Sequence, residues 1–159
     1  MTKDFIVDAS IGIAWVHPAQ ATSGSQTLLQ ALCDGAVVQA PALWPLETAN
    51  ALLVLARRGK LTEEERGAAL SALAKLSVVL DHEMASLAFS RLSALASQHG
   101  LSVYDAAYLE LALRKKHPLA CKDGPLRAAA KRCRVKLLYE SLAAKARQVV
   151  PRRRAAGSL

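Results

Sequence analysis

Short apolar runs alternate along the chain with longer segments of helical period, and this alternation constrains the fold more than any other feature. Five runs have the length of buried strands, at 5–7, 36–40, 77–80, 119–121 and 135–139. Helix-length segments lie between them, at about 25–34, 46–58, 63–75, 85–98, 104–116 and 126–132. Strands that alternate with helices predict an α/β fold, in which right-handed crossovers build a parallel sheet covered on both faces.

Turn and capping residues fall where this assignment needs them. Glycines stand at three predicted helix ends: Gly35, Gly59 and Gly100. Prolines stand at two predicted helix starts: Pro45 and Pro125. Thr62 and Glu65 have the spacing of a capping box at the start of the third helix. The local signals therefore agree with the alternating pattern.

The length of 159 residues suffices for one domain with a sizeable core. We predict that domain over 1–140, followed at 141–159 by a last helical turn or two and a flexible basic tail. The three cysteines form no Cys-x-x-Cys pair and the four histidines have no metal-ligand spacing, so neither a zinc site nor structural disulfides are expected. No apolar window is long enough to cross a membrane, and the N-terminus is not a secretory signal, so a cytoplasmic protein is expected.

Charge is distributed unevenly along the chain. Of the 21 basic residues, 14 lie between Arg114 and the C-terminus, where only Asp123 and Glu140 are acidic. The preceding 113 residues carry 11 acidic and 7 basic residues. A basic region of this kind favours a polyanionic partner such as nucleic acid, because phosphate neutralisation releases counterions. A solvated basic helix is the alternative.

Four carboxylates are predicted to meet at one edge of the sheet. Asp8 directly follows the first strand, and Asp123 lies two residues past the fourth. Glu47 falls in the first turn of the helix after the second strand, and Asp105 opens the helix after Gly100. Because ligands of open parallel sheets bind outside the C-terminal strand ends, these side chains are expected on a common rim.

Each acid also has an ordinary structural explanation. Asp8, Asp105 and Asp123 occupy positions typical of helix caps, and Glu47 suits the positive end of a helix dipole. Capping alone does not explain a cluster of four acids, because two carboxylates about 4 Å apart repel by roughly 4 kcal/mol at an effective dielectric near 20. Such a cluster would have raised pKa values or would need a cation. Carboxylate oxygens without histidine or cysteine favour Mg²⁺ or Mn²⁺. Such ions activate water and polarise phosphates, which is the chemistry of phosphodiester hydrolysis.

Four short motifs resemble those of PIN-domain proteins, in particular VapC-type toxins. The motifs are Val7-Asp8-Ala9-Ser10 followed by 11–15, Leu46-Glu47-Thr48-Ala49-Asn50-Ala51-Leu52, Tyr104-Asp105-Ala106-Ala107-Tyr108, and Ala120-Cys121-Lys122-Asp123 with Leu126. Their order and spacing match from about Ile6 to Tyr139, nearly the whole chain. The resemblance implies a three-layer α/β/α sandwich with a Rossmann-like parallel sheet, and Mg²⁺- or Mn²⁺-dependent endoribonuclease activity on RNA. It also implies a homodimer and a small antitoxin whose C-terminal segment occludes the acidic site.

The same resemblance assigns roles to individual residues. Metal binding and catalysis fall to four carboxylates: Asp8, Glu47, Asp105 and Asp123. Polar support of that site falls to Ser10 and Asn50. Cys121 departs from the family, which commonly has Ser or Thr there; a thiol is a poorer hydrogen-bond partner, and the alternative is a small buried residue.

Other residues are candidates for contact with RNA or a partner, or are expected away from the site. Lys122, beside the fourth acid, is a candidate for contact with the scissile phosphate, with simple surface exposure as the alternative. Four more basic residues are candidates for gripping the RNA backbone or for a solvated face: Arg127, Lys131, Arg132 and Arg134. Glu110 is expected on a different side of its helix, and Trp15 and Trp44 are expected to pack or to contact an antitoxin.

The leading hypothesis is therefore a metal-dependent ribonuclease, the toxin of a VapBC-type toxin–antitoxin pair. One alternative is a PIN module that has lost catalysis and binds RNA or a protein partner. A general RNA-processing nuclease outside a toxin system is another. A phosphatase on a similar sheet is disfavoured, because Asp8-x-Ser10 lacks the second acid that such motifs carry.

Overall fold

A parallel four-stranded sheet, in the order β3-β2-β1-β4, forms the centre of the molecule. The computed structural model describes residues 4–139, so the predicted tail at 141–159 lies outside the described residues. The strands are β1 (Phe5–Val7), β2 (Val38–Pro41), β3 (Val78–Asp81) and β4 (Leu119–Ala120). Each neighbouring pair is parallel. This arrangement confirms the predicted α/β fold with a central parallel sheet.

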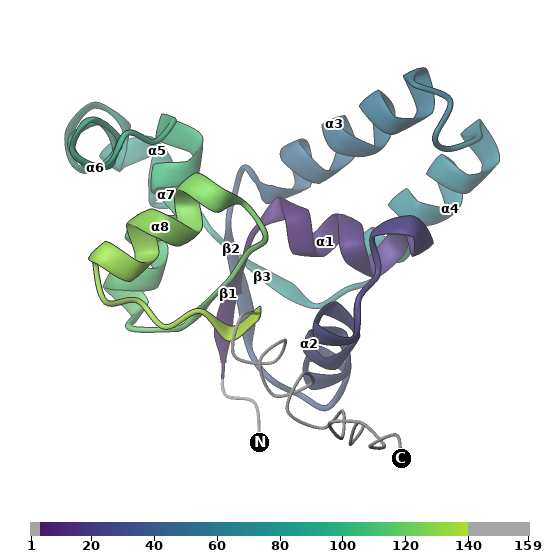
Figure 1. The fold of residues 1–159 in the computed structure, drawn as a ribbon, viewed down its shortest axis with the longest axis horizontal. Helices are drawn as coiled ribbons and strands as arrows, with labels where there is room; N and C mark the ends of the chain where they lie inside the picture. The colour runs from purple at the N-terminus through teal and green to yellow at the C-terminus, as the bar shows by residue number, and fades with distance from the viewer. Residues whose placement is uncertain (1–3, 140–159) are drawn as a thin grey trace, which may run out of the picture.

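Helices cover both faces of the sheet. One layer consists of α1 (Ala9–Val16), the 3₁₀ turn η1 (Pro18–Gln20), α2 (Ser23–Cys33), α3 (Trp44–Arg57) and α4 (Glu63–Ala74). The other consists of α5 (Met84–Leu87), the π-helical turn η2 (Ala88–Leu92), α6 (Ser93–His99), α7 (Val103–Lys115) and α8 (Gly124–Arg132). Figure 1 shows the two groups on opposite sides of the strands, so the predicted three-layer sandwich is confirmed. No helix within residues 4–139 has the length and apolar character needed to span a bilayer.

The connections explain why the two layers form. From β1 through β2 to β3 the chain moves in one direction across the sheet, and it then returns to add β4 on the other side of β1. Because parallel crossovers are right-handed, this reversal puts α1 to α4 and α5 to α8 on different faces. The reversal also makes the space beyond the ends of β1 and β4 the topological switch point, where open α/β sheets bind their ligands.

Two sequence predictions differ from the structure. The segment 85–98, predicted as a single helix, is divided by the π-helical turn η2 into α5 and α6. The fifth strand predicted at 135–139 is wrong: Leu137 forms only an isolated bridge with Leu119, and the chain turns helical from Leu138. Leu137 and Leu138 are both buried, so the apolar run reflects packing under the sheet edge. A backbone φ of 59° at Arg134 redirects the chain just before this segment.

Close packing of α1 against α3 positions the edge of the sheet where β1 ends. Helix α1 follows β1 directly, although the sequence analysis gave it no bounds. A Cβ atom at Gly12 would lie 2.7 Å from the ring of Trp44, so glycine permits this approach. The Trp44 indole Nε1 donates to the carbonyl oxygen of Asp8 at 3.1 Å. The start of α3 is thereby held against the end of β1, which confirms the packing role expected for Trp44.

Candidate active site

Two of the four predicted acids cap helices at the switch point. Asp8 is the N-cap of α1, and its Oδ1 accepts hydrogen bonds from the Ile11 amide at 3.2 Å and the Ser10 hydroxyl at 2.6 Å. Asp123 is the N-cap of α8, and its Oδ2 accepts from the Leu126 amide at 2.9 Å. The capping interpretation of both residues is therefore confirmed. Each cap uses one carboxylate oxygen and leaves the second outside the cap.

The other two acids lie in first helical turns. Glu47 is in the first turn of α3, and its Oε1 accepts a hydrogen bond from the hydroxyl of Tyr108 at 2.8 Å. Asp105 is in the first turn of α7, whose N-cap Ser102 accepts from the Asp105 amide at 3.0 Å. All four acids thus sit where helices begin, with the positive ends of helix dipoles behind them.

Electrostatic coupling shows that the four carboxylates face a common region. The charges of Asp123 and Glu47 both raise the pKa of Asp8, the charge of Asp105 raises the pKa of Glu47, and the charge of Asp123 raises the pKa of Asp105. The coupling therefore runs around a closed ring of four residues. Figure 1 shows the first turns of α1 and α3 close together beyond the ends of β1 and β2. This coupling is consistent with the predicted convergence of the four acids, whose role as a common site stays a prediction.

Asp8 is the most perturbed member of this ring. Its side chain is almost completely buried, and desolvation is the main reason that its pKa rises from 3.8 to about 7. Hydrogen bonds from Ser10 and Ile11 oppose this rise, and the charges of Asp123 and Glu47 add to it. Burial also raises the pKa values of Glu47 and Asp105, against hydrogen bonds from Tyr108 and Ser102. Negative charge at this site is therefore costly without a cation.

Ser10 connects the ends of β1 and β4. Its hydroxyl donates to Asp8 and accepts from the backbone amide of Lys122 at 2.9 Å. The neighbouring Cys121 is buried, and its thiol pKa is raised chiefly by burial and then by the charge of Asp8. A neutral buried thiol matches the structural alternative considered for Cys121. The polar support lies on Ser10.

Lys122 and Asn50 are the other two residues predicted to support the site. The ammonium group of Lys122 donates to the carbonyl oxygen of Gln20 at 3.1 Å, so in this structure it is engaged on the segment between α1 and α2. Asn50 is exposed on α3, three residues after Glu47, and within residues 4–139 no hydrogen bond joins it to the four acids. Contact of Lys122 or Asn50 with a substrate therefore stays a prediction.

The basic residues predicted to grip RNA lie on α8 and just beyond it. Lys131, Arg132 and Arg134 are exposed, and Arg127 is partly buried. Arg132 donates to the carbonyl oxygen of His99 at 3.1 Å, which ties α8 to the end of α6. Because Asp123 caps α8, this basic helix leads directly away from the acidic ring. The start of α8 therefore lies at Asp123, and its exposed basic residues lie toward its other end.

The oxygen atoms of the four carboxylates are the possible ligands of a divalent ion at this site. Within residues 4–139, the side chains as they lie do not form a group of three or more that could hold a metal ion. The chemistry of the set nevertheless fits Mg²⁺ or Mn²⁺, because carboxylates are hard oxygen donors and a cation would relieve the burial and repulsion that raise the pKa values of Asp8, Glu47 and Asp105.

Glu110 belongs to a different cluster, as the sequence analysis expected. It is buried on α7, where Arg114 donates to its Oε1 at 2.9 Å and Arg91 lies 3.4 Å from the same oxygen. Arg114 also forms a paired contact with Asp81 at the end of β3, with distances of 2.7 and 3.1 Å. This ion-pair network ties α7 to β3 and η2.

Two residues contact members of the ring in ways that the sequence did not predict. Tyr108 is fully buried on α7 and reaches Glu47 across 61 positions of sequence. Trp44 holds the backbone of Asp8, as described above. Both belong to quoted or flanking motifs, but no periodicity in the sequence shows which atom each side chain reaches.

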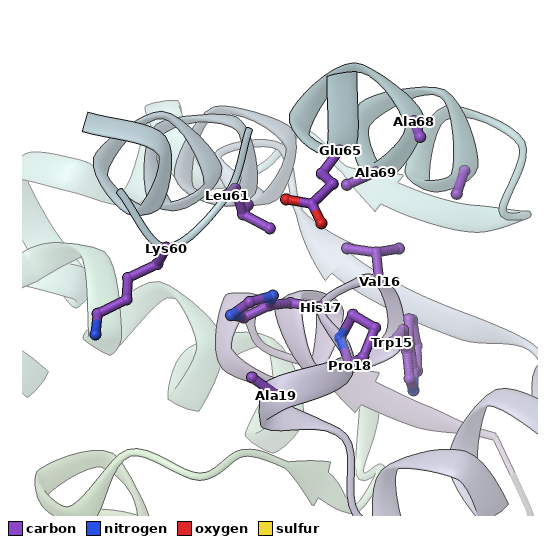
Figure 2. Close-up of a pocket in the computed structure, with 11 residues that line it drawn as sticks. Trp15, Val16, His17, Pro18, Ala19, Lys60, Leu61, Glu65, Ala68 and Ala69 are labelled. Carbon is purple, nitrogen blue, oxygen red and sulfur yellow. The ribbon is translucent and has the colours of Figure 1, made fainter. Parts of the chain in front are cut away.

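A pocket of about 560 Å³ lies at the opposite end of α1, between that end and the turn from α3 to α4. Its walls are mostly apolar, with Lys60 and Glu65 at the side of α4 and the preceding turn. His17 also lines it, and the His17 ring is more than nine-tenths buried while its Nδ1 has no hydrogen-bond partner within residues 4–139. Figure 2 shows the His17 ring and the Glu65 carboxylate directed into this space. The sequence analysis assigned no role to His17.

Solved structures share this architecture. PAE2754 from Pyrobaculum aerophilum is 22% identical with a TM-score of 0.65, covering 92% of this chain and 91% of that one. VapC20 from Mycobacterium tuberculosis, a sarcin-ricin loop cleaving toxin, is 21% identical with a TM-score of 0.56, covering 79% and 95%. VapBC2 from Rickettsia felis, bound to a DNA fragment from its promoter, is 12% identical with a TM-score of 0.56, covering 84% and 96%. No protein-family profile matches the sequence, and no curated protein matches it.

The topology and these likenesses define the class of the fold. A parallel sheet of order β3-β2-β1-β4, with helices on both faces and acids at the switch point, is the fold of PIN domains. The resemblance drawn from the four motifs is confirmed at the level of the fold, which structural neighbours from toxin–antitoxin proteins share. At identities below 25%, the likeness shows the fold alone.

Proposed function

We propose that this protein is a metal-dependent endoribonuclease, the toxin of a toxin–antitoxin pair. The observation that carries the proposal is the closed ring of coupled carboxylates at the switch point, with one member almost completely buried. The adjacent basic helix α8 supplies the charge that a polyanionic substrate needs. The similarity to VapC20, a toxin that cleaves the sarcin-ricin loop, supports RNA as the substrate.

The carboxylates of the ring would hold Mg²⁺ or Mn²⁺: Asp8, Glu47, Asp105 and Asp123. The bound ion supplies a water of lowered pKa and a charge that polarises the phosphate. The chain's own part is to orient the carboxylates, and the hydrogen bonds from Ser10 and Tyr108 favour ionised Asp8 and Glu47 against the effect of burial. Ser10 fixes one oxygen of Asp8, and Tyr108 fixes one oxygen of Glu47. The helix starts behind the ring partly offset the repulsion among the acids.

Cleavage of RNA is the direct test. We expect the purified protein to cut an RNA hairpin that carries the sarcin-ricin loop, or an unstructured RNA, when Mg²⁺ or Mn²⁺ is present. A chelator should abolish the reaction, and readdition of the ion should restore it. Raising salt from about 50 to about 200 mM should weaken RNA binding several-fold or more, because phosphate contacts release counterions.

The results of these assays distinguish the proposed function from its alternatives. RNA binding with no cleavage by either ion would favour the alternative of a PIN module without catalysis. Cleavage by a protein whose expression does not arrest growth, and whose neighbouring reading frame encodes no partner, would favour general RNA processing. Cleavage that is unaffected by the chelator would overturn the metal-dependent proposal. Homodimer formation stays a prediction, to be measured by light scattering on the same preparation.

The protein partner proposed here is an antitoxin segment that docks in the pocket beside His17. The similar structure of VapBC2, a toxin–antitoxin protein, supports a partner of this kind. The pocket offers apolar walls and one buried ring nitrogen that lacks a hydrogen-bond partner within the described residues. Since α1 has eight residues, a segment seated there lies roughly 12 Å from the acid at the other end of the helix. It could therefore extend to cover the acidic ring.

Substitution of one pocket wall tests this location. Ala72 lines the pocket from α4 and is exposed, so Ala72→Arg should fill the space without disturbing the core. We expect this variant to lose copurification with the product of the neighbouring reading frame while it keeps RNA cleavage. Ser71→Arg adds the same charge at an exposed neighbouring position outside the pocket and is the matched control. Equal copurification of both variants would place the partner elsewhere.

A further inference from the structure

Tyr108 is not an acidic residue, but its side chain contacts one of the four acids of the ring. Its side chain is one of the largest fully buried groups in the described residues, at 1% exposure. The hydroxyl donates to Oε1 of Glu47 at 2.8 Å. Burial is the main cause of a phenol pKa well above its ordinary value, followed by the charge of Glu47 and those of Asp8 and Asp105. Because a carboxylate oxygen can only accept, the hydroxyl of Tyr108 is the donor of this hydrogen bond.

The location of this hydrogen bond matters for the ring. Glu47 belongs to α3 in one layer, whereas Tyr108 and Asp105 belong to α7 in the other, one helical turn apart. The Tyr108–Glu47 bond is thus a direct link between the two layers at the edge where the acids meet. Because Glu47 has a long side chain with several rotamers, holding one of its oxygens removes freedom that metal binding would otherwise have to restrict.

We propose that Tyr108 is a positioning residue that fixes Glu47 for divalent-ion binding. This inference rests on the proposed function, because it assigns the Tyr108 hydroxyl to the same metal-binding ring. The bond occupies Oε1 and leaves Oε2 of Glu47 for an ion, and it satisfies a carboxylate that is only partly open to water. Outer hydrogen-bond partners of this kind change metal affinity or activity by roughly 10- to 100-fold when they are removed.

Tyr108→Phe tests the proposal, since it removes only the hydroxyl. Titration with Mn²⁺ by calorimetry should show a dissociation constant roughly 10-fold higher than that of the parent. RNA cleavage at low Mn²⁺ should fall by a similar factor and should recover largely at saturating Mn²⁺, because the ligands themselves remain. Because an ion that binds the folded state also stabilises it, a urea melt without metal is needed to separate weaker binding from a folding defect.

Tyr139→Phe is the matched control. It also removes a tyrosine hydroxyl that hydrogen-bonds across the fold, in this case to Thr22 Oγ1 at 3.1 Å, but its partner is uncharged. We expect Mn²⁺ affinity in this variant to equal that of the parent. A urea melt of each protein measures the loss of stability that the two substitutions share.

A second background keeps the test decisive if Tyr108→Phe is poorly folded. Glu47→Ala removes the acceptor through which Tyr108 is inferred to act, so no carboxylate is left without its donor in the double variant. Adding Tyr108→Phe to Glu47→Ala should then change Mn²⁺ affinity by less than about 2-fold, as expected for two residues that act through one interaction.

The possible failures are distinguishable. If the parent neither binds Mn²⁺ nor cleaves RNA, the proposed function fails, and with it the premise of this inference. If the parent binds and cleaves while Tyr108→Phe binds Mn²⁺ as tightly as Tyr139→Phe does, the role of Tyr108 is overturned and the proposed function stands. An effect of equal size in the Glu47→Ala background would also overturn it, because Tyr108 would then act by another route.

Discussion

Replacing Asp8 with asparagine is expected to abolish RNA cleavage and, at the same time, to stabilise the metal-free protein. Asparagine keeps an oxygen that can accept the hydrogen bonds from Ser10 and Ile11, so the cap of α1 survives. It removes the negative charge that a divalent ion needs. We expect cleavage to fall by roughly 100-fold or more, measured under single-turnover conditions.

The gain in stability follows from the raised pKa of Asp8. Between its ordinary value of 3.8 and the folded value of about 7, the folded state binds more protons than the unfolded state does. The free energy of unfolding of the metal-free parent therefore falls as the pH rises through this window. The whole shift corresponds to at most about 4 kcal/mol. Because the new amide also has to be buried, we expect Asp8→Asn to gain about 2 kcal/mol at pH 8.

Urea melts with a chelator present, at pH 4 and at pH 8, measure this effect. The advantage of Asp8→Asn should be present at pH 8 and almost absent at pH 4, where the parent carboxyl is already protonated in the folded state. Asp34→Asn, an exposed aspartate at the end of α2, is the control and should change neither cleavage nor the pH dependence. A variant that is strongly destabilised at both pH values would show that Asp8 serves the fold alone.

The positions of the acids could be predicted from the sequence, because each depends on chain-local signals. Asp8 and Asp123 follow apolar strands, and Asp105 follows Ser102 with capping spacing. In a parallel sheet, these signals also fix the edge on which the side chains emerge. The capping and clustering interpretations looked like alternatives in the sequence. The structure shows that they are compatible, since a cap needs one carboxylate oxygen and each carboxylate has two.

Other features depend on contacts that local patterns do not encode. The apolar run around Leu137 satisfies the pattern of a strand, yet the turn at Arg134 leaves room for only one bridge. Tyr108 reads as a core residue of α7, and only the packing of α7 against α3 brings its hydroxyl to Glu47. Only the folded structure shows that Nδ1 of His17 is buried beside a pocket without a hydrogen-bond partner among the described residues. Tertiary packing decides all three.

Substitution of Arg114 is expected to have the largest effect on stability. Its guanidinium group donates to Glu110 and to both oxygens of Asp81, and the side chain of Glu110 is only 3% exposed. Arg114→Met keeps the apolar stem but leaves Glu110 with the more distant Arg91 at 3.4 Å. Breaking a buried ion pair from one side costs about 3 kcal/mol, because the remaining charge stays buried. We expect a loss of this size in a urea melt at pH 7.

The pH dependence and a second substitution identify the cause. The Arg114 hydrogen bonds hold the pKa of Asp81 below its usual 3.8, so this part of the stability is complete above that pH and is lost as the pH falls through the lowered value. The difference between parent and Arg114→Met should therefore shrink in acid. Adding Glu110→Gln should recover part of the loss, because the uncompensated buried charge is then gone.

The exposed pair of Arg66 and Glu63 on α4 provides the comparison for this network. The two side chains lie 2.7 Å apart, three residues apart on one helix, with Glu63 71% exposed. Water screens such a pair, so Arg66→Met should change the urea midpoint little. Equal losses from Arg66→Met and Arg114→Met would refute the argument from burial. A fully folded Arg114→Met protein should still cleave RNA, because Arg114 binds Asp81 and Glu110 and contacts none of the four acids of the ring in the described hydrogen bonds.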